Sequence, residues 1–329
     1  MKTRMIMSRT PLRITFVGGG TDIPAYYRAN GHGSVLSAAI NKYIYVVINK
    51  KFDTKIRVSY SVTEIVDRVD QIKHPTVREA LKLLGIDGGI EIVSISDIPS
   101  RGTGLGSSST FLVGLLNALH AYRGEHASPD QLAREAVKIE REILGEAGGK
   151  QDQYIAAYGG IQQMEFFSDE RVVVRPVIMT EPMRDSLEKW LLLLYTGKER
   201  SSVDIHREQS TKVNDNIASY NRMRDLVYKA MESINDSDMV RLGQLLHENW
   251  MEKRKLASGI TDNWIDSCYE KALEYGAIGG KMIGAGGGGF LLLLAPPETH
   301  GDIIRNLPEL RKEEFQFDYY GSRIILVGD

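Results

Sequence analysis

Three glycines and three serines that suit phosphate binding share one short stretch of the chain. The stretch reads Gly102-Thr103-Gly104-Leu105-Gly106-Ser107-Ser108-Ser109. An apolar, strand-like run at 90–95 precedes it, and apolar residues at helical spacing follow it over 112–122. Alternating glycines let the backbone turn with several N–H groups pointing inward, and a helix start adds free N–H groups and a positive dipole end. The stretch is therefore predicted to bind an anion, and a polyphosphate fits it best.

The plainer alternative for this stretch is a tight turn followed by a capped helix. One serine is enough to cap a helix, so the run of three hydroxyls favours the phosphate loop. The loop is not a Walker A motif, because no lysine follows its last glycine. It is not a protein-kinase loop either, because the chain contains no His-Arg-Asp and no Asp-Phe-Gly sequence.

A carboxylate on an apolar helix face is the second feature with chemical potential. Ser128-Pro129-Asp130-Gln131 is a capping box with proline in the first helical position, which predicts a helix start. Glu140 falls on the apolar stripe of that helix together with Leu132, Ala136, Val137, Ile143 and Leu144. A buried carboxylate is costly unless it is paired or binds a metal. Two interpretations therefore stay open for Glu140, a salt bridge to an arginine and a metal ligand.

Composition limits the class of protein. The chain has 329 residues, 42% hydrophobic and 26% charged residues, and a net charge of −2, so it has room for two domains and no overall field that attracts nucleic acid or anionic membranes. The single Cys268 excludes an internal disulfide and a cysteine-based zinc site. No apolar run approaches the ~18 residues of a membrane span, and the first residues do not resemble a signal peptide. These features predict a cytoplasmic protein that binds no nucleic acid and no membrane, and they leave a homo-oligomer open.

The elements that must position these residues alternate between strands and helices. Strands are predicted at 5–17, 43–49, 55–60, 90–95, 190–195, 290–294, 315–320 and 323–327, with long amphipathic helices over 213–234 and 242–250. The charged stretch 168–184 contains two prolines and is predicted to separate an N-terminal domain, 1–175, from a C-terminal domain, 176–329.

Two further glycine clusters lie outside the phosphate loop. Gly18-Gly19-Gly20-Thr21-Asp22 ends the first strand, but Ile23 stands where a dinucleotide-binding motif needs a third glycine. Lys281-Met282-Ile283-Gly284-Ala285-Gly286-Gly287-Gly288-Gly289 precedes the strand at 290–294.

Taken together, three motifs resemble the GHMP kinase superfamily, named for its galactokinase, homoserine, mevalonate and phosphomevalonate kinases. They are Thr10-Pro11-Leu12-Arg13-Ile14 running on to Asp22, the loop 99–109, and the glycine motif 281–289. The motifs span most of the chain and keep the family order. The resemblance implies a fold of two α+β domains with the active site in the cleft between them, ATP and Mg²⁺ as cofactors, and residues 102 and 104–109 as the ATP loop.

The resemblance also implies roles for single residues. Arg13 and Asp22 match the arginine near the transferred phosphoryl group and the sugar-binding aspartate of the galactokinases. Glu140 and Asp152 match the magnesium-binding carboxylate and the catalytic aspartate, and Ser108 is the second magnesium ligand. For Asp152 the alternative is a helix N-cap after Gly148-Gly149. Substrate contacts are expected from Gly19, Gly20, Thr21, Asp22, Gly286 and Gly287.

The substrate implied is a sugar phosphate. Galactokinases carry Glu-His where this chain has Gly19-Gly20, so the motif resembles instead the D-glycero-D-manno-heptose 7-phosphate kinases and the related fucokinases. The first group phosphorylates the anomeric hydroxyl to give the 1,7-bisphosphate, for nucleotide-activated heptose and surface polysaccharide synthesis. A fucose or other sugar 1-kinase, and a catalytically silent relative that senses ATP and sugar, are the alternatives.

The sequence says least about which basic residues bind the phosphate that the substrate already carries. Lys198 and Arg200 follow the predicted strand 190–195, with Lys150 in reserve, and solvated charges beside a turn are an equal alternative. His32 and His206 lack partners at metal-binding spacing, and no role is predicted for them.

Overall fold

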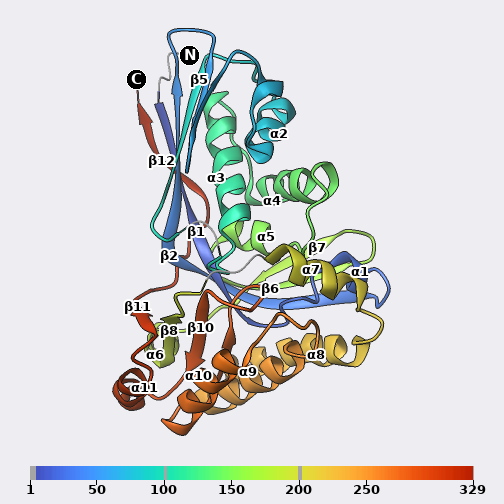
Figure 1. The fold of residues 1–329 in the computed structure, drawn as a ribbon, viewed down its shortest axis with the longest axis vertical. Helices are drawn as coiled ribbons and strands as arrows, with labels where there is room; N and C mark the ends of the chain where they lie inside the picture. Colours follow the sequence, from blue (N-terminus) through green and yellow to red (C-terminus); the bar gives the residue numbers. More distant parts are fainter. Residues whose placement is uncertain (1–4, 100–101, 199–201, 329) are drawn as a thin grey trace.

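A computed structural model describes residues 5–99, 102–198 and 202–328. Its strands form two separate sheets, both covered by helices (Figure 1). Mixed helices and strands confirm the α+β class predicted from the sequence. Among the described helices none is long and apolar enough to cross a membrane.

The first sheet has eight strands and is organised by two long ones. β1 (Met5–Val17) pairs along most of its length with β2 (His32–Lys50), which is antiparallel to it. The strand order is β12-β1-β2-β5-β3-β4, and β6 and β7 extend the sheet from the other half of β2. Their bounds are β3 (Ile56–Ser59), β4 (Thr63–Val66), β5 (Ile90–Ser96), β6 (Ile161–Phe167), β7 (Val172–Pro176) and β12 (Arg323–Gly328). Only β3 and β5 run parallel among the described pairings.

Pro11 lies inside β1, at a position where the strand pairing does not need its missing N–H group. β12 pairs with β1 only as far as Arg9, and the register with β2 shifts directly after Pro11. The proline therefore occupies a strand position with a neighbour on one side, at a bulge.

Helices of the N-terminal half cover one face of this sheet. α3 (Ser107–Tyr122) packs on β1 and β2, and α2 and α4 lie beside it (Figure 1). The bounds are α1 (Pro24–Tyr27), η1 (Val69–Gln71), α2 (Pro75–Leu83), α4 (Pro129–Val137), η2 (Lys138–Ile143) and α5 (Gln151–Tyr158). The Ser128 hydroxyl accepts a hydrogen bond from the Gln131 backbone N–H, so the predicted helix start is confirmed. The apolar periodicity did not show that the helix continues as the π-helix η2.

The second sheet has four antiparallel strands in the order β11-β8-β10-β9. These are β8 (Leu191–Tyr195), β9 (Gly279–Met282), β10 (Phe290–Leu294) and β11 (Arg311–Glu313). The surrounding helices are α6 (Glu181–Trp190), α7 (Ser202–Thr211), α8 (Ile217–Asn235), α9 (Met239–Lys253), α10 (Asn263–Glu274), η3 (Pro297–Thr299) and α11 (His300–Asn306). α8 and α9 pack against each other, and both also contact β1 of the first sheet. The apolar faces of α8 and α9, the second of which includes Trp250, are buried in the core, as predicted.

The end of the chain returns to the first sheet. β12 pairs with β1, which places the two ends of the described chain side by side (Figure 1). The strand predicted at 315–320 is wrong: Phe317 makes only an isolated bridge to Ile40, and the edge strand of the second sheet is β11. The boundary between 175 and 176 stays a prediction, with β7 in the first sheet and β8 in the second.

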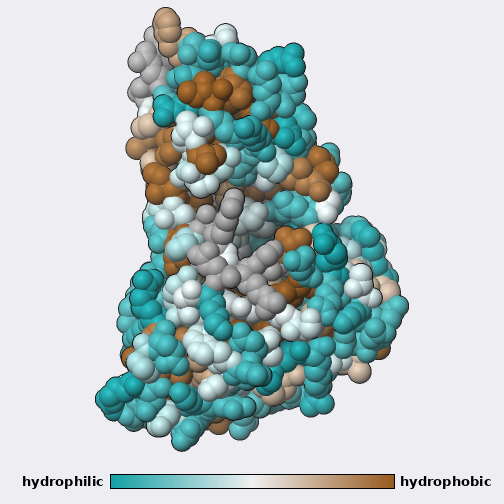
Figure 2. Space-filling view, in the orientation of Figure 1, coloured by the Kyte–Doolittle hydropathy of each residue, from teal (hydrophilic) through white to brown (hydrophobic). Residues whose placement is uncertain are grey.

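The surface shown in Figure 2 is largely hydrophilic, with small, separate apolar patches. Exposed large apolar side chains lie on several elements, and Ile325, Leu326 and Val327 are consecutive on β12.

Candidate active site

The glycine loop has the backbone geometry that its sequence predicts. Gly102, Gly104 and Gly106 have φ values of 71°, 73° and 78°, in the left-handed region that favours glycine. Gly106 is the N-cap of α3, and no side chain caps this helix. The serines at 107–109 are therefore not caps but the first helical residues, so the alternative of a serine-capped turn is not what the structure has. The loop residues 100 and 101 lie outside the described residues.

The C-terminal glycine motif lies directly against this loop. A Cβ on Gly104 would lie 2.6 Å from the Ile283 carbonyl oxygen, and a Cβ on Gly284 would lie 2.6 Å from Gly104 backbone atoms. These glycines let two backbones approach that are 180 residues apart in the sequence. The predicted substrate contacts Gly286 and Gly287 lie elsewhere, against Ile260, whose carbonyl oxygen accepts a hydrogen bond from the Gly287 N–H.

Glu140 is buried beside the start of α3, with 1% of its surface exposed. Its two carboxylate oxygens accept hydrogen bonds from the hydroxyls of Ser108 at 3.1 Å and Ser109 at 2.8 Å, and from the Gln153 side-chain amide. Arg141 is 3.9 Å away, at the edge of ion-pair distance. Hydroxyl donors therefore dominate its environment, and Ser108 itself is exposed.

This donor set fits Mg²⁺ in one specific way. Among the described residues no three His, Cys, Asp or Glu side chains gather as a metal cluster. Mg²⁺ in phosphoryl-transfer sites is held by one or two protein oxygens together with waters and substrate phosphates. Glu140 and Ser108 would supply that small number of oxygens.

Arg13 and Asp152 form a two-pronged ion pair between β1 and the first turn of α5. The Arg13 Nε donates to Asp152 Oδ1 and its Nη2 donates to Oδ2, both at 2.8 Å. The remaining Arg13 Nη1 donates to the Gly104 carbonyl of the glycine loop. Asp152 is the second residue of α5, and Lys150 is the N-cap, so the N-cap alternative for Asp152 does not hold. The pair thus connects a carboxylate to the phosphate loop through one guanidinium group.

Asp22 is held by amide groups instead of by a cation. It accepts hydrogen bonds from the backbone N–H groups of Gly20 and Gln151, both at 3.0 Å, and from the Gln151 side chain at 3.3 Å. Gly149 must be glycine, because a Cβ there would lie 1.8 Å from Asp22 Oδ2. Thr21, predicted to contact substrate, is fully buried and bonds Ser34.

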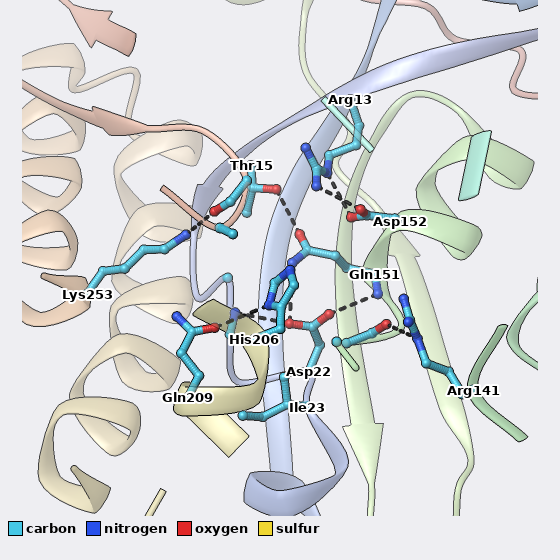
Figure 3. Close-up of a pocket in the computed structure, with 16 residues that line it drawn as sticks. Arg13, Thr15, Asp22, Ile23, Arg141, Gln151, Asp152, His206, Gln209 and Lys253 are labelled. Atoms are coloured by element: carbon cyan, nitrogen blue, oxygen red, sulfur yellow. Dashed lines mark hydrogen bonds and ion pairs between the residues drawn. The ribbon is translucent and has the colours of Figure 1, made fainter. Parts of the chain in front are cut away.

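These groups line one pocket, which Figure 3 shows. Its N-terminal side comes from Arg13, Thr15, Gly19, Gly20, Asp22, Ile23, Arg141, Gly148, Gly149, Gln151 and Asp152. Its C-terminal side comes from His206, Gln209, Lys253, Gly284 and Ala285. The arrangement brings a carboxylate and a guanidinium to a single cavity, and the guanidinium bonds the glycine loop beside it, as phosphoryl transfer to a hydroxyl requires.

Sequence reasoning missed the C-terminal side of this pocket. His206 and Gln209 come from α7 and are hydrogen-bonded to each other at 3.3 Å. Burial lowers the pKa of His206, which favours its neutral form. Lys253 ends α9, and its Nζ bonds the Gly284 carbonyl. Burial, aided by the nearby Arg13, lowers the pKa of Lys253 to about 8. None of these residues belongs to a local motif, so no signal in the sequence identifies them.

Two predicted phosphate ligands, Lys198 and Lys150, do not line this pocket. Lys198 is 39% exposed, pairs with Asp262 at 3.0 Å and lies over the Trp264 ring. Lys150 is buried and pairs with Glu170. Arg200 lies outside the described residues. The role of Lys198 in binding the substrate phosphate stays a prediction.

Comparison with known proteins adds independent findings. Residues 71–160 match the GHMP kinases N terminal domain, and residues 230–310 match the GHMP kinases C terminal domain. A D-glycero-alpha-D-manno-heptose 7-phosphate kinase of Campylobacter jejuni is 32% identical, with 95% of each chain covered. A bifunctional fucokinase/GDP-fucose pyrophosphorylase of Arabidopsis thaliana is 27% identical over 94% of this chain and 31% of its own.

Among solved structures, one similar protein is described as a D-glycero-D-manno-heptose 1-phosphate kinase from Bacteriodes thetaiotaomicron. It has a TM-score of 0.82 and 25% identity, and the comparison covers 98% of this chain and all of that one.

Proposed function

The chain belongs to the GHMP kinase family and is a sugar kinase, and from that premise we propose a specific reaction. It transfers the γ-phosphoryl group of ATP to the anomeric hydroxyl of D-glycero-D-manno-heptose 7-phosphate, and the products are the 1,7-bisphosphate and ADP. The observation that carries the proposal is the Arg13–Asp152 pair, which lines the pocket and is hydrogen-bonded to the glycine loop. The similarity to the C. jejuni enzyme supports the choice of sugar.

The chain's own residues supply a proton acceptor and positive charge. Asp152 takes the proton from the anomeric hydroxyl, whose oxygen then bonds to the γ-phosphorus while the bond from that phosphorus to the β–γ bridging oxygen breaks. A carboxylate keeps lone pairs free when each oxygen accepts one bond from Arg13, so the pair leaves Asp152 able to accept that proton. Arg13 holds Asp152 in place and adds positive charge next to the loop.

ATP would lie along residues 102–109, with its phosphates on the loop N–H groups and the start of α3. Mg²⁺ would be held by Glu140 and Ser108. Bound there, it would neutralise the part of the phosphate charge that the loop N–H groups do not neutralise.

Asp22 and Gln151 provide the contacts for sugar hydroxyls. The Asp22 carboxylate is fixed by amide donors and lines the pocket. Gly19 and Gly20 lack side chains on the same side, which leaves room for a seven-carbon sugar. We propose that these residues orient the acceptor, so that its anomeric hydroxyl faces Asp152.

The second candidate is an L-fucose 1-kinase, which the similarity to the Arabidopsis protein favours. A catalytically silent sensor is the third. The intact set of Arg13, Ser108, Glu140 and Asp152 argues against the sensor, because a silent protein has no use for a proton acceptor.

The test is an ATP-consumption assay of the purified protein with heptose 7-phosphate, heptose 1-phosphate, free heptose and L-fucose. Phosphorus NMR of the product then locates the new phosphate. Preferred turnover of heptose 7-phosphate with a new anomeric phosphate supports the proposal. Equal or better turnover of fucose would overturn it in favour of the 1-kinase alternative, and no turnover with any sugar would favour the sensor.

A further inference from the structure

Two buried lysines on the C-terminal half of the protein have no acidic partner among the described residues. Lys253 is 4% exposed, and its ammonium group donates a hydrogen bond to the Gly284 carbonyl. Lys281, on β9, is 0% exposed, and its Nζ has no hydrogen-bond partner among the residues that the structure describes. Neither lysine lies within ion-pair distance of a carboxylate in the part of the chain that the structure describes.

An unpaired buried ammonium group is costly, so its presence calls for an explanation. Burial lowers the pKa of Lys281 well below its ordinary value, and the neighbouring Lys253 and Arg13 lower it further. Asp22 acts in the opposite direction on both lysines, and Asp152 does so on Lys253, but the Asp22 oxygens are already bonded to amides and the Asp152 oxygens to Arg13. This region of the protein is therefore short of negative charge.

The lysines face the part of the pocket next to Gly19. Lys253 lines the pocket directly and reaches into it from α9, across from Arg141 (Figure 3). A Cβ on Gly19 would lie 3.8 Å from the Lys281 Nζ and 3.6 Å from the Gln151 side-chain nitrogen. The space over Gly19 is thus bordered by one pocket-lining lysine and one lysine behind it.

We propose that Lys253 binds the phosphate that the acceptor sugar already carries, with Lys281 adding positive charge behind Gly19. The proposal rests on the proposed function and identifies the residue that makes this kinase prefer a sugar phosphate to a free sugar. It replaces Lys198, which is exposed and already paired with Asp262.

A phosphate group at Lys253 could come from the acceptor or from ATP. The acceptor is favoured because Lys253 lines the same pocket as Gly19, Gly20 and Asp22, whereas residues 102–109 of the glycine loop do not line it. The nucleotide is the other source, because Lys253 bonds Gly284, which packs against Gly104 of the loop. The glycine loop and the start of α3 already offer ATP a set of N–H donors. The experiment below separates the two sources.

The test measures binding by calorimetry, without turnover, for heptose 7-phosphate, free heptose and ATP with Mg²⁺. Lys253→Met should weaken heptose 7-phosphate binding about 10- to 150-fold, the range for one lost charge-assisted bond. Its affinities for free heptose and for ATP should stay within about twofold of wild type. Lys255→Met is the matched control, because Lys255 lies two residues away, is exposed and pairs with Glu252. Lys253→Gln serves as a second variant if Lys253→Met does not fold.

Each other outcome contradicts the proposal. Unchanged preference for the phosphorylated sugar in Lys253→Met assigns its phosphate to another residue, and a loss in Lys198→Met instead restores the ligand predicted from sequence. A selective loss of ATP affinity assigns Lys253 to the donor nucleotide. If wild-type protein itself binds free heptose as well as heptose 7-phosphate, the proposed function fails first, and that result is visible before any variant is measured.

Discussion

The two sides of the pocket differ in how their charges are compensated. On the N-terminal side, Arg13 pairs with Asp152, and Asp22 accepts bonds from amides. On the C-terminal side, Lys253 lines the pocket without an acidic partner among the described residues, and Lys281 lies buried behind it.

The difference indicates which charged groups already have partners before a ligand binds. Charges that are already paired hold their geometry at no further cost, which suits a proton acceptor that must be placed accurately. Cations without partners gain their compensation from a bound anion, which suits recognition of a substrate phosphate. The predictions below test this division, beginning with the largest expected effect.

Asp152→Asn should lower kcat by about 10²- to 10⁴-fold, because the amide cannot accept the proton of the acceptor hydroxyl. The shape of the side chain is kept, so ATP affinity measured by calorimetry should change little. Asp302→Asn, at an exposed position on α11, is the control and should retain wild-type kcat. Wild-type turnover in Asp152→Asn would place the proton acceptor elsewhere.

Glu140→Gln should weaken the apparent Mg²⁺ affinity about 10- to 150-fold, since one charged ligand contact is lost. The measurement is the ATP-consumption rate as a function of Mg²⁺ concentration at saturating sugar. Glu232→Gln, exposed on α8, is the control. An unchanged Mg²⁺ requirement would return Glu140 to a structural role beside the serines.

The glycine loop beside the pocket and the start of α4 were predictable because their residues sit in local motifs. Left-handed glycines, a helix start and a capping box each depend on a few consecutive residues, and Gly102, Gly104, Gly106 and Ser128 lie where those rules placed them. The strand over 5–17 has the predicted bounds for the same reason.

The C-terminal side could not be predicted, because tertiary packing alone brings it together. His206 and Lys253 lie on amphipathic helices, where a polar residue is ordinarily solvated. The glycine motif 281–289 has a packing role that its sequence conceals, since Gly284 approaches Gly104 from the other half of the chain. Lys198 looked suitable because it follows a buried strand, but its distance from the pocket depends on how β8 is placed.

Gly19→Asp should weaken binding of the sugar phosphate about tenfold, because it supplies a fixed carboxylate where the substrate phosphate is proposed to lie. A side chain at this position points toward the Lys281 Nζ, and Gly19 has no positive φ that would strain it. Calorimetry with heptose 7-phosphate measures the loss. Gly301→Asp, at a helix position with open space, is the control. Affinity equal to wild type would show that the space over Gly19 is not used by the substrate.

The smallest expected effect is on stability, and it has opposite signs on the two sides. Without ligand, Lys253→Met should raise the free energy of unfolding at pH 7 by about 1 kcal/mol, because an apolar side chain replaces a buried, unpaired ammonium group. Arg13→Met should lower it, because Asp152 is left without its partner.

The pH dependence gives this last prediction a second, independent readout. The folded-state pKa of Lys253 is lowered to about 8 from an ordinary value of 10.5, so between these pH values the unfolded chain binds more protons at this residue than the folded one. Wild-type stability should therefore rise relative to Lys253→Met as the pH increases from 8 to 10.5, and the advantage of the variant should shrink. Denaturant unfolding of both proteins at pH 7, 8.5 and 10 measures this difference. A Lys253→Met variant that is less stable than wild type at pH 7 would mean that Lys253 is compensated without ligand, and the two sides of the pocket would then be alike.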